Sequence, residues 1–363
     1  MSIYISLLLL CFWGCTEDLP AQKAPPISED NQEPLPLPLA DLECVPGGEF
    51  IEINAETSLP KPFIEICEDH LGITPPIRCE DGVLIPVTVD GEEVWEDVGF
   101  YGCDNSSLQV GQCIPGSTIQ RLSGVTRDGI PLPEVVWVAF CRTGVDPEAS
   151  GEELTYSNDV QVIGYNYESG ATCFLNNVRQ FGFHDGTARN EQAWRAKGSV
   201  PSSKDPMFST ILSASGPPPC TLCHRSSPFI HNDFVDSARM PDDPDEPVLP
   251  IINAPNAPYW PIAHNDWDLR TVYIEGNACL ACHRINMGLI ELFERNHWDV
   301  NEHMPPQNPG SMAEDYEALL DCWTNGPENT PGCYWVIPPG GECDGGIVDE
   351  DYPFATDSVI PPP

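Results

Sequence analysis

Two short motifs of the same form constrain what this chain can fold around. They are Cys220–His224 and Cys279–His283, and each reads C-x-x-C-H. C-x-x-C-H is the attachment signature of c-type haem, in which both thiols bind the porphyrin and the histidine reaches one axial face of the iron. The chain has only 16 cysteines and 8 histidines, so two chance copies are improbable. We therefore expect two covalently attached haem c groups, bound by Cys220, Cys223, Cys279 and Cys282, with His224 and His283 as iron ligands.

Two other interpretations of these motifs stay open at this point. Each cysteine pair could close a disulfide loop beside an incidental histidine. Alternatively, the two motifs together could supply the four nitrogen and sulfur ligands of a zinc ion.

The N-terminus is typical of an exported protein. The run from Ile3 to Trp13 has the length of a signal-peptide core and is too short to span a bilayer. Its end, Gly14-Cys15, resembles a bacterial lipoprotein signal, which would make Cys15 the lipidated residue. Because Thr16 follows, that resemblance implies an outer-membrane lipoprotein facing the periplasm or the cell surface. Ordinary secretion and a misplaced start are the alternatives.

The remaining cysteines agree with export. Once Cys11, Cys15 and the four motif cysteines are set aside, an even number is left, which permits five disulfides in an oxidising compartment. These residues are Cys44, Cys67, Cys79, Cys103, Cys113, Cys141, Cys173, Cys322, Cys333 and Cys343.

The net charge of the chain limits the kinds of molecule that it can bind. The chain has 16 basic and 56 acidic residues, for a formal net charge of −40. Such a surface argues against binding to nucleic acid and favours cationic partners. The membrane contact that we expect is through the lipid anchor.

Composition divides the chain into five parts. The acidic, proline-rich stretch after the signal is typical of an extended tether. The parts are a signal peptide (1–14), a tether (15–43), a β-rich disulfide domain (44–177), a haem domain (178–345, core 215–325) and an acidic tail (346–363).

The part from 44 to 177 consists of short β-like runs. Val83–Val89 and Glu92–Val98 flank Asp90-Gly91, which predicts a hairpin. Val135–Phe140 is a candidate for a buried strand, and Val160–Tyr167 alternates in polarity. We expect a disulfide-braced β-sandwich-like domain, and we find no catalytic set in it.

The haem region contains three helix candidates. A short helix is expected within 226–240. Ile285–His297 carries a one-sided apolar stripe. A third helix is expected from Ser311 to Trp323, with Ser311 and Glu314 as a capping box.

Residues 215–325 resemble the bacterial cytochrome c families, in which C-x-x-C-H is followed by a Met-Pro loop and a closing helix. Met304-Pro305-Pro306 and the helix after it match that ending. The resemblance implies a mainly α, loop-rich dihaem domain with Met304 as a sixth iron ligand, and thus a mixed fold for the whole chain.

The axial ligands are only partly assigned. Met304 follows the second motif closely and the first at a distance, so the iron that it would serve is open. The candidates for the other iron are His264, His231, His303, His297 and Met240.

These features favour an exported dihaem cytochrome that carries electrons to a redox partner with a basic patch. One alternative is a dihaem enzyme with one open iron, similar to dihaem peroxidases. Another is a surface binding or sensing protein in which the β domain recognises the partner. Whether the protein is an enzyme is open.

Overall fold

The fold is described here from a computed structural model of the chain. The structure describes residues 63–108, 111–145, 156–177, 183–184, 191–214, 223–262, 268–304, 310–341 and 343–348. The predicted signal peptide, the predicted tether with Cys15 and most of the predicted acidic tail lie outside these residues. Within the described residues, no helix has both the length and the apolar character needed to cross a bilayer.

The described residues contain more strand than helix. The helices are α1 (Phe63–Leu71), α2 (Glu191–Trp194), α3 (Phe208–Ile211), α5 (Asp233–Asp236), α6 (Met287–Asn296), α7 (Val300–His303) and α8 (Ala313–Asn325), with 3-10 turns at Cys79–Asp81 and Ala278–Ala281.

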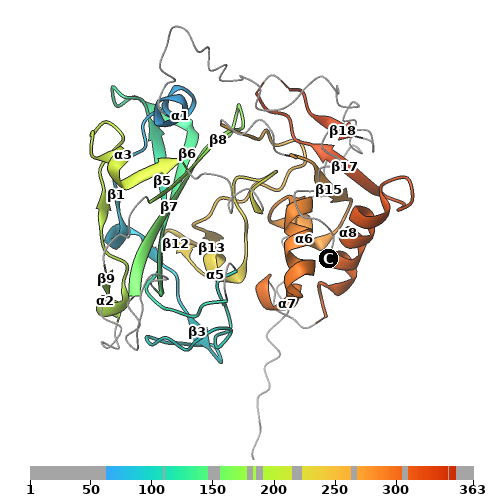
Figure 1. The fold of residues 1–363 in the computed structure, drawn as a ribbon, viewed down its shortest axis with the longest axis horizontal. Coiled ribbons are helices and arrows are strands. Elements are labelled where there is room, and N and C mark those ends of the chain that lie inside the picture. Colours follow the sequence, from blue (N-terminus) through green and yellow to red (C-terminus); the bar gives the residue numbers. More distant parts are fainter. Residues whose placement is uncertain are drawn as a thin grey trace, which may run out of the picture. The chain divides into compact units, whose positions relative to one another are not determined.

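The largest element is an eight-stranded sheet with the order β11-β8-β7-β6-β5-β2, in which β14 also pairs with β8 and β9 with β7. Figure 1 shows its long strands β5 to β8 in green shades. The strands are β2 (Val83–Leu84), β5 (Thr118–Val125), β6 (Pro131–Val145), β7 (Tyr156–Asn166), β8 (Ala171–Asn177), β9 (Phe183–His184), β11 (Leu212–Ala214) and β14 (Trp260–Pro261). The sheet therefore includes strands from beyond residue 177.

Strand β6 is buried on both faces. Trp137 and Ala139 point into one apolar cluster, with α1 and α3. Val138 and Phe140 belong to a second cluster, which packs against the segment 229–252. The apolar run that predicted a buried strand is confirmed. The expected β-sandwich is wrong, because among the described residues the second face is covered by parts of 85–113 and 229–269 and not by a second large sheet.

Disulfides brace the sheet and its surroundings, as the cysteine pattern predicted. The bonds within the described residues are Cys67–Cys173, Cys79–Cys141, Cys103–Cys113 and Cys322–Cys333. Cys343 is also disulfide-bonded. The first two lie within the cluster on the α1 side of the sheet.

A second sheet forms in the region expected to be mainly helical. Its order is β16-β15-β17-β18, and α8 packs on β15 and β17. Figure 1 shows β15, β17 and β18 with α6 and α8, in orange and red. Its strands are β15 (Thr271–Ile274), β16 (Ile285–Asn286), β17 (Cys333–Ile337) and β18 (Gly346–Val348).

The expectation of a mainly α haem domain is therefore wrong. The reason is that β15 pairs with β17, a strand far away in the sequence. Short apolar runs of four or five residues do not show periodicity that would separate strand from helix, and pairing between distant segments leaves no local signal.

Three two-stranded sheets complete the described part of the fold. The hairpin is confirmed in shortened form: β3 (Thr88–Val89) and β4 (Glu92–Glu93) flank Asp90 and Gly91, both at positive φ. The remaining pairs are β1 (Ile77–Arg78) with β10 (Ser199–Val200), and β12 (Arg239–Met240) with β13 (Asp243–Pro247).

The predicted helices are partly right. The helix from 285 is present as α6, which Asn286 caps by accepting from Leu289 N–H at 2.9 Å. Helix α8 is present, but its N-cap is Met312 without a side-chain hydrogen bond, so the predicted capping box is wrong. The helix expected within 226–240 is only the single turn α5.

The disulfides allow a graded stability test. Cys67–Cys173 closes a loop of 106 residues, whereas Cys103–Cys113 closes one of 10. In the chain-entropy view, a longer closed loop removes more freedom from the unfolded chain. We expect the double variant Cys67→Ser/Cys173→Ser to lose roughly 4–5 kcal/mol of unfolding free energy, and Cys103→Ser/Cys113→Ser at most about 3 kcal/mol. Urea unfolding followed by circular dichroism measures both, and equal losses would contradict the ranking.

Candidate functional site

The second C-x-x-C-H motif spans a 3-10 turn that local hydrogen bonds hold in place. Asn277 accepts from Cys279 N–H at 3.0 Å and donates to the Asp315 carbonyl oxygen at 2.8 Å, which ties the turn to α8. His283 then forms a bridge with Ile252, and β16 and α6 follow. Cys279 and Cys282 are free thiols. The motif is therefore fixed to its surroundings without using either sulfur.

The thiols and the histidine of this motif open into one apolar cavity. Its volume, including the open mouth, is about 570 Å³. The lining is His231, Ala278, Cys279, Cys282, His283, Ile285, Leu289, Ile290, Phe293, Val300, Met304, Met312, Tyr316 and Leu319. The apolar stripes of α6 and α8 thus face the motif.

Burial controls the protonation of the motif. Burial, assisted by His231, lowers the pKa of His283 to about 3. The ring is therefore neutral at pH 7, which is the form of histidine that binds metals. Its Nδ1 lies 3.0 Å from the Arg284 carbonyl oxygen. Burial, with Asp315 nearby, raises the pKa of the Cys279 thiol to about 12.

Met304 lies in the same cavity as His283. It follows α7, and its N–H donates to the Val300 carbonyl oxygen at 2.9 Å. The sequence left open which motif Met304 would serve, and the fold groups it with the second. The determining element is α7, a single turn that brings the chain back to the cavity after α6.

The first motif lies against the large sheet. Cys223 and His224 are described, whereas Cys220 lies outside the described residues. The His224 ring lies 5.3 Å from the Phe174 ring on β8, and burial lowers the pKa of His224 to about 4.

A second cavity of about 890 Å³, mouth included, surrounds His224. Its lining combines the sheet face with the segment after the motif: Ser107, Leu108, Ile119, Val138, Phe140, Arg142, Gln161, Ile163, Cys223, His224, Phe229, Ile230, Asn232, Phe234, Val235 and Leu249. Sequence reasoning missed every sheet residue in this list. The even-numbered positions of β6 were visible as apolar, but nothing local indicated what would cover them.

The two motifs are joined by side chains. Asn286, which caps α6, donates to the Cys223 carbonyl oxygen at 2.7 Å. The Tyr259 hydroxyl donates to the His224 carbonyl oxygen. The guanidinium of Arg284 lies over the Tyr259 ring, 5.7 Å from its centre. The two cavities therefore belong to adjacent parts of one structure.

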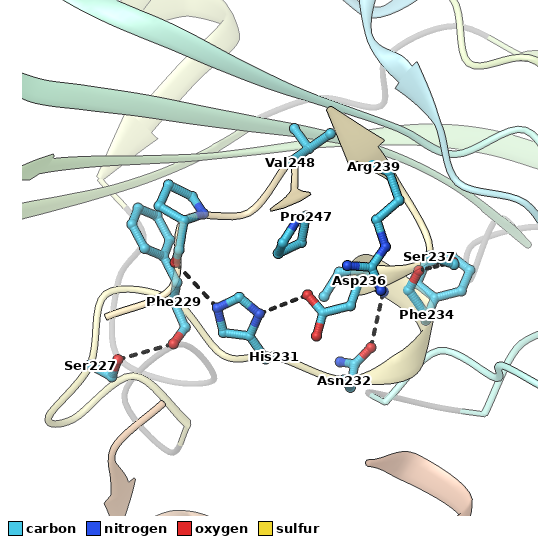
Figure 2. A network of polar contacts seen from close by, with 12 residues as sticks. Ser227, Phe229, His231, Asn232, Phe234, Asp236, Ser237, Arg239, Pro247 and Val248 are labelled. Carbon is cyan, nitrogen blue, oxygen red and sulfur yellow. Dashed lines mark hydrogen bonds and ion pairs between the residues drawn. The ribbon is translucent and has the colours of Figure 1, made fainter. Parts of the chain in front are cut away.

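His231, an axial-ligand candidate, is engaged elsewhere. Its Nδ1 lies 2.7 Å from Asp236 Oδ1 and its Nε2 lies 3.2 Å from the Pro250 carbonyl oxygen. Figure 2 shows the ring beside Asp236 of α5, with a dashed line marking their contact. Both ring nitrogens thus lie within hydrogen-bonding distance of protein oxygens, so neither is directed at a metal ion. His231 instead stacks on His283, with ring centres 6.3 Å apart.

The other candidates are distributed as follows. His303 is buried among Tyr101, Phe293 and Trp298, and burial lowers its pKa. His297 ends α6 in a left-handed conformation and is exposed. Met240 packs on the cluster beneath the sheet. None of the three lines either cavity, and His264 lies outside the described residues.

Within the described ranges, no group of three or more His, Cys, Asp or Glu side chains is arranged to hold a metal ion. Comparison of the chain with protein families, with curated protein sequences and with solved structures finds no match. The motifs and the cavities around them are therefore the features of this chain that bear on its function.

The link between the motifs can be tested at Asn286. The residue is fully buried and makes two hydrogen bonds, one to cap α6 and one to Cys223. We expect Asn286→Ala to lower the free energy of unfolding by about 2 kcal/mol, as the sum of a lost cap and a lost buried hydrogen bond. Thermal and urea unfolding measure the change.

Asn296→Ala is the matched control, because it makes the same substitution at an exposed position in the same helix. We expect it to change stability by no more than about 0.5 kcal/mol. Equal effects of the two variants would contradict a structural link through Asn286.

Proposed function

We propose that the protein is an exported dihaem c-type cytochrome that carries electrons. The observation that carries the proposal is the cavity in which Cys279, Cys282, His283 and Met304 meet an apolar lining. A covalently bound haem uses two thiols and a neutral imidazole, and Met304 adds a second possible axial donor beside an apolar wall. The residues present therefore fit the group that the motif implies.

When bound, haem supplies the one-electron redox chemistry, and the protein supplies position and electrostatics. The thiols of each motif would attach the group, and His224 and His283 would each hold an iron. Leu289, Phe293 and Leu319 would exclude water from the second site. The hydrogen bonds from Asn286 and Tyr259 to the first motif keep the two sites adjacent, which favours electron exchange between them.

The compartment and anchor belong to the same proposal. The disulfides of the described residues suit an oxidising compartment. Cys15 after an apolar run supports lipidation and attachment to the outer membrane, facing the periplasm or the cell surface. The net charge of −40 supports a redox partner with a basic patch.

The direct test is the intact mass of the protein produced in cells that mature haem c. We expect two covalent haem groups in the wild type and one in Cys279→Ser/Cys282→Ser or in Cys220→Ser/Cys223→Ser. A wild type without covalent haem would overturn the proposal. It would favour the disulfide or zinc interpretation of the motifs.

Met304 provides a test of the axial ligand. Because methionine with histidine raises the reduction potential relative to other ligand sets, we expect Met304→Ala to lower one of the two potentials in a spectroscopic redox titration. The same variant should let the reduced second site bind carbon monoxide.

Met312→Ala is the control, because Met312 lines the same cavity and its substitution also removes one thioether. We expect both potentials to stay near their wild-type values. The opposite pattern, with Met312→Ala and not Met304→Ala lowering a potential, would show that Met304 is not the ligand.

The acidic surface predicts that association with a basic partner depends on salt. Raising the ionic strength from 0.01 M to 0.15 M shortens the screening length from about 30 Å to about 8 Å. We expect stopped-flow electron exchange with a small basic cytochrome to slow over this range, whereas exchange with an uncharged redox dye should not. Equal salt dependence of the two reactions would argue against electrostatic docking.

A further inference from the structure

Two aromatic side chains are exposed side by side on a braced loop between β4 and β5. Phe100 is 65% exposed and Tyr101 is 49% exposed. The Cys103–Cys113 disulfide closes the loop, and the Tyr101 N–H donates to the Gly111 carbonyl oxygen at 2.7 Å. Tyr101 has a positive φ of 54°, which is uncommon for a bulky residue. The loop therefore presents two large apolar rings to solvent at a defined place.

The Tyr101 ring connects this loop to the surroundings of the second motif. It packs over Gly111, where it fills the space that a Cβ atom would take, and its centre lies 5.9 Å from that of the His303 ring. His303 ends α7, and the first residue of that helix, Val300, lines the cavity that contains Met304. The exposed rings and the exposed side of α7 therefore belong to one surface next to this cavity.

The charges beside the rings have one sign. Asp97 accepts from Gly99 N–H at 2.8 Å, which places its carboxylate close to Phe100. Asp299 caps α7 and Glu302 lies within it, and both are exposed. The two stretches that meet here, 79–120 and 296–363, contain no lysine or arginine. The result is an apolar centre with acidic neighbours, which we call the α7 surface: Asp97, Phe100, Tyr101, Asp299 and Glu302.

We propose that the α7 surface is the docking site for a one-electron redox protein that carries basic residues around an apolar patch. This inference rests on the proposed function, because it places the partner beside the second motif. In the exchange one protein loses an electron and the other gains it, so no bond forms or breaks. The net charge of the chain predicts a basic partner, and the α7 surface gives the place where that partner binds.

The composition of the surface favours such a protein over other occupants. Protein interfaces are enriched in aromatic residues at their centre and are polar at their rim. Electron-transfer encounters are small and bury less than about 1,200 Å², which suits two large rings with a few carboxylates. A second copy of this chain would bring a net charge of −40 against the same charge, and facing like charges disfavour association. An anionic membrane surface is disfavoured for the same reason.

The position of the surface suits electron exchange with the second site. Phe293 lines the cavity, and its ring centre lies 5.9 Å from that of His303, which Tyr101 contacts in turn. A partner seated on Tyr101 is therefore separated by the His303 ring from a residue of the cavity wall. Because electron exchange becomes slower as the separation grows, docking at this place favours the reaction.

The test measures association and electron exchange separately, in mature protein whose haem count is verified by intact mass. The probe is a small basic cytochrome c. Calorimetry with both proteins oxidised gives the Kd, because no electron can then pass. Stopped-flow mixing of the reduced protein with the oxidised probe gives the second-order rate constant.

We expect Phe100→Ser to raise the Kd about fivefold or more, as truncation of a central aromatic residue of an interface does. We expect Asp299→Asn/Glu302→Gln to lower the rate constant about threefold or more at 0.01 M ionic strength, and asparagine preserves the cap of α7. The second difference should shrink at 1 M ionic strength, where the screening length is about 3 Å.

Ile130→Ser and Glu65→Gln/Asp69→Asn are the matched controls. Ile130 is 61% exposed in the turn between β5 and β6. Glu65 and Asp69 are exposed on α1, which packs on the face of the large sheet opposite to the loop that carries Phe100. Both controls remove the same kinds of group and should leave the Kd and the rate constant near their wild-type values. If each variant behaves like its control, docking occurs elsewhere and the inference is overturned.

Three further outcomes would overturn the docking site. The first is a wild type with two haems and no measurable affinity for the probe at 0.01 M ionic strength. The second is slower exchange of the α7-surface variants with an uncharged redox dye, because the substitutions would then act on the second site itself. The third is a wild-type dimer in light scattering that Phe100→Ser abolishes, because the surface would then join two copies of the chain. All three leave electron transfer by the haems intact, whereas a wild type without covalent haem removes the proposed function and this inference together.

Discussion

Burial of strand β6 on both faces is the constraint on which the rest of the structure depends. Trp137 and Cys141 belong to the cluster with α1 and the Cys67–Cys173 disulfide. Val138 and Phe140 face the other way and line the cavity that contains His224. Because successive side chains on a strand alternate between faces, one strand both anchors the disulfide core and forms a wall of the first motif's site. A change in its register would exchange these two sets of side chains.

A buried cation, Arg284, lies beside the second motif and contacts a residue that binds the first. Arg284 is 3% exposed, follows His283 directly and lies over the ring of Tyr259. Burial lowers its pKa to about 10, so it stays charged at pH 7. Its Nε and Nη2 have no hydrogen-bond partner in the described part of the chain.

Local patterns predicted some elements well and others not at all. Asp90-Gly91 specified its turn, the run from Val135 specified a strand, and the stripe from Met287 specified α6, since each depends on neighbours in the sequence. The four-stranded sheet around β15 was missed because its strands are short and pair over long distances. The sequence also did not predict which segments pack on the face of the main sheet that carries Phe140, because those segments are distant in the sequence. His231 is a ligand candidate by sequence alone, but the fold places Asp236 and Pro250 at its two nitrogens.

The sequence by itself determined the chemistry that is available: two C-x-x-C-H motifs, a methionine after the second, an even set of further cysteines and a strongly acidic surface. These are properties of residue type and spacing, which need no fold to be read. Only the tertiary structure decided which donors share a cavity. It grouped Met304 with His283 and brought Arg142 and Gln161 from the sheet to His224. Those neighbours come from segments far apart in the chain, and their meeting depends on how apolar faces are covered in three dimensions.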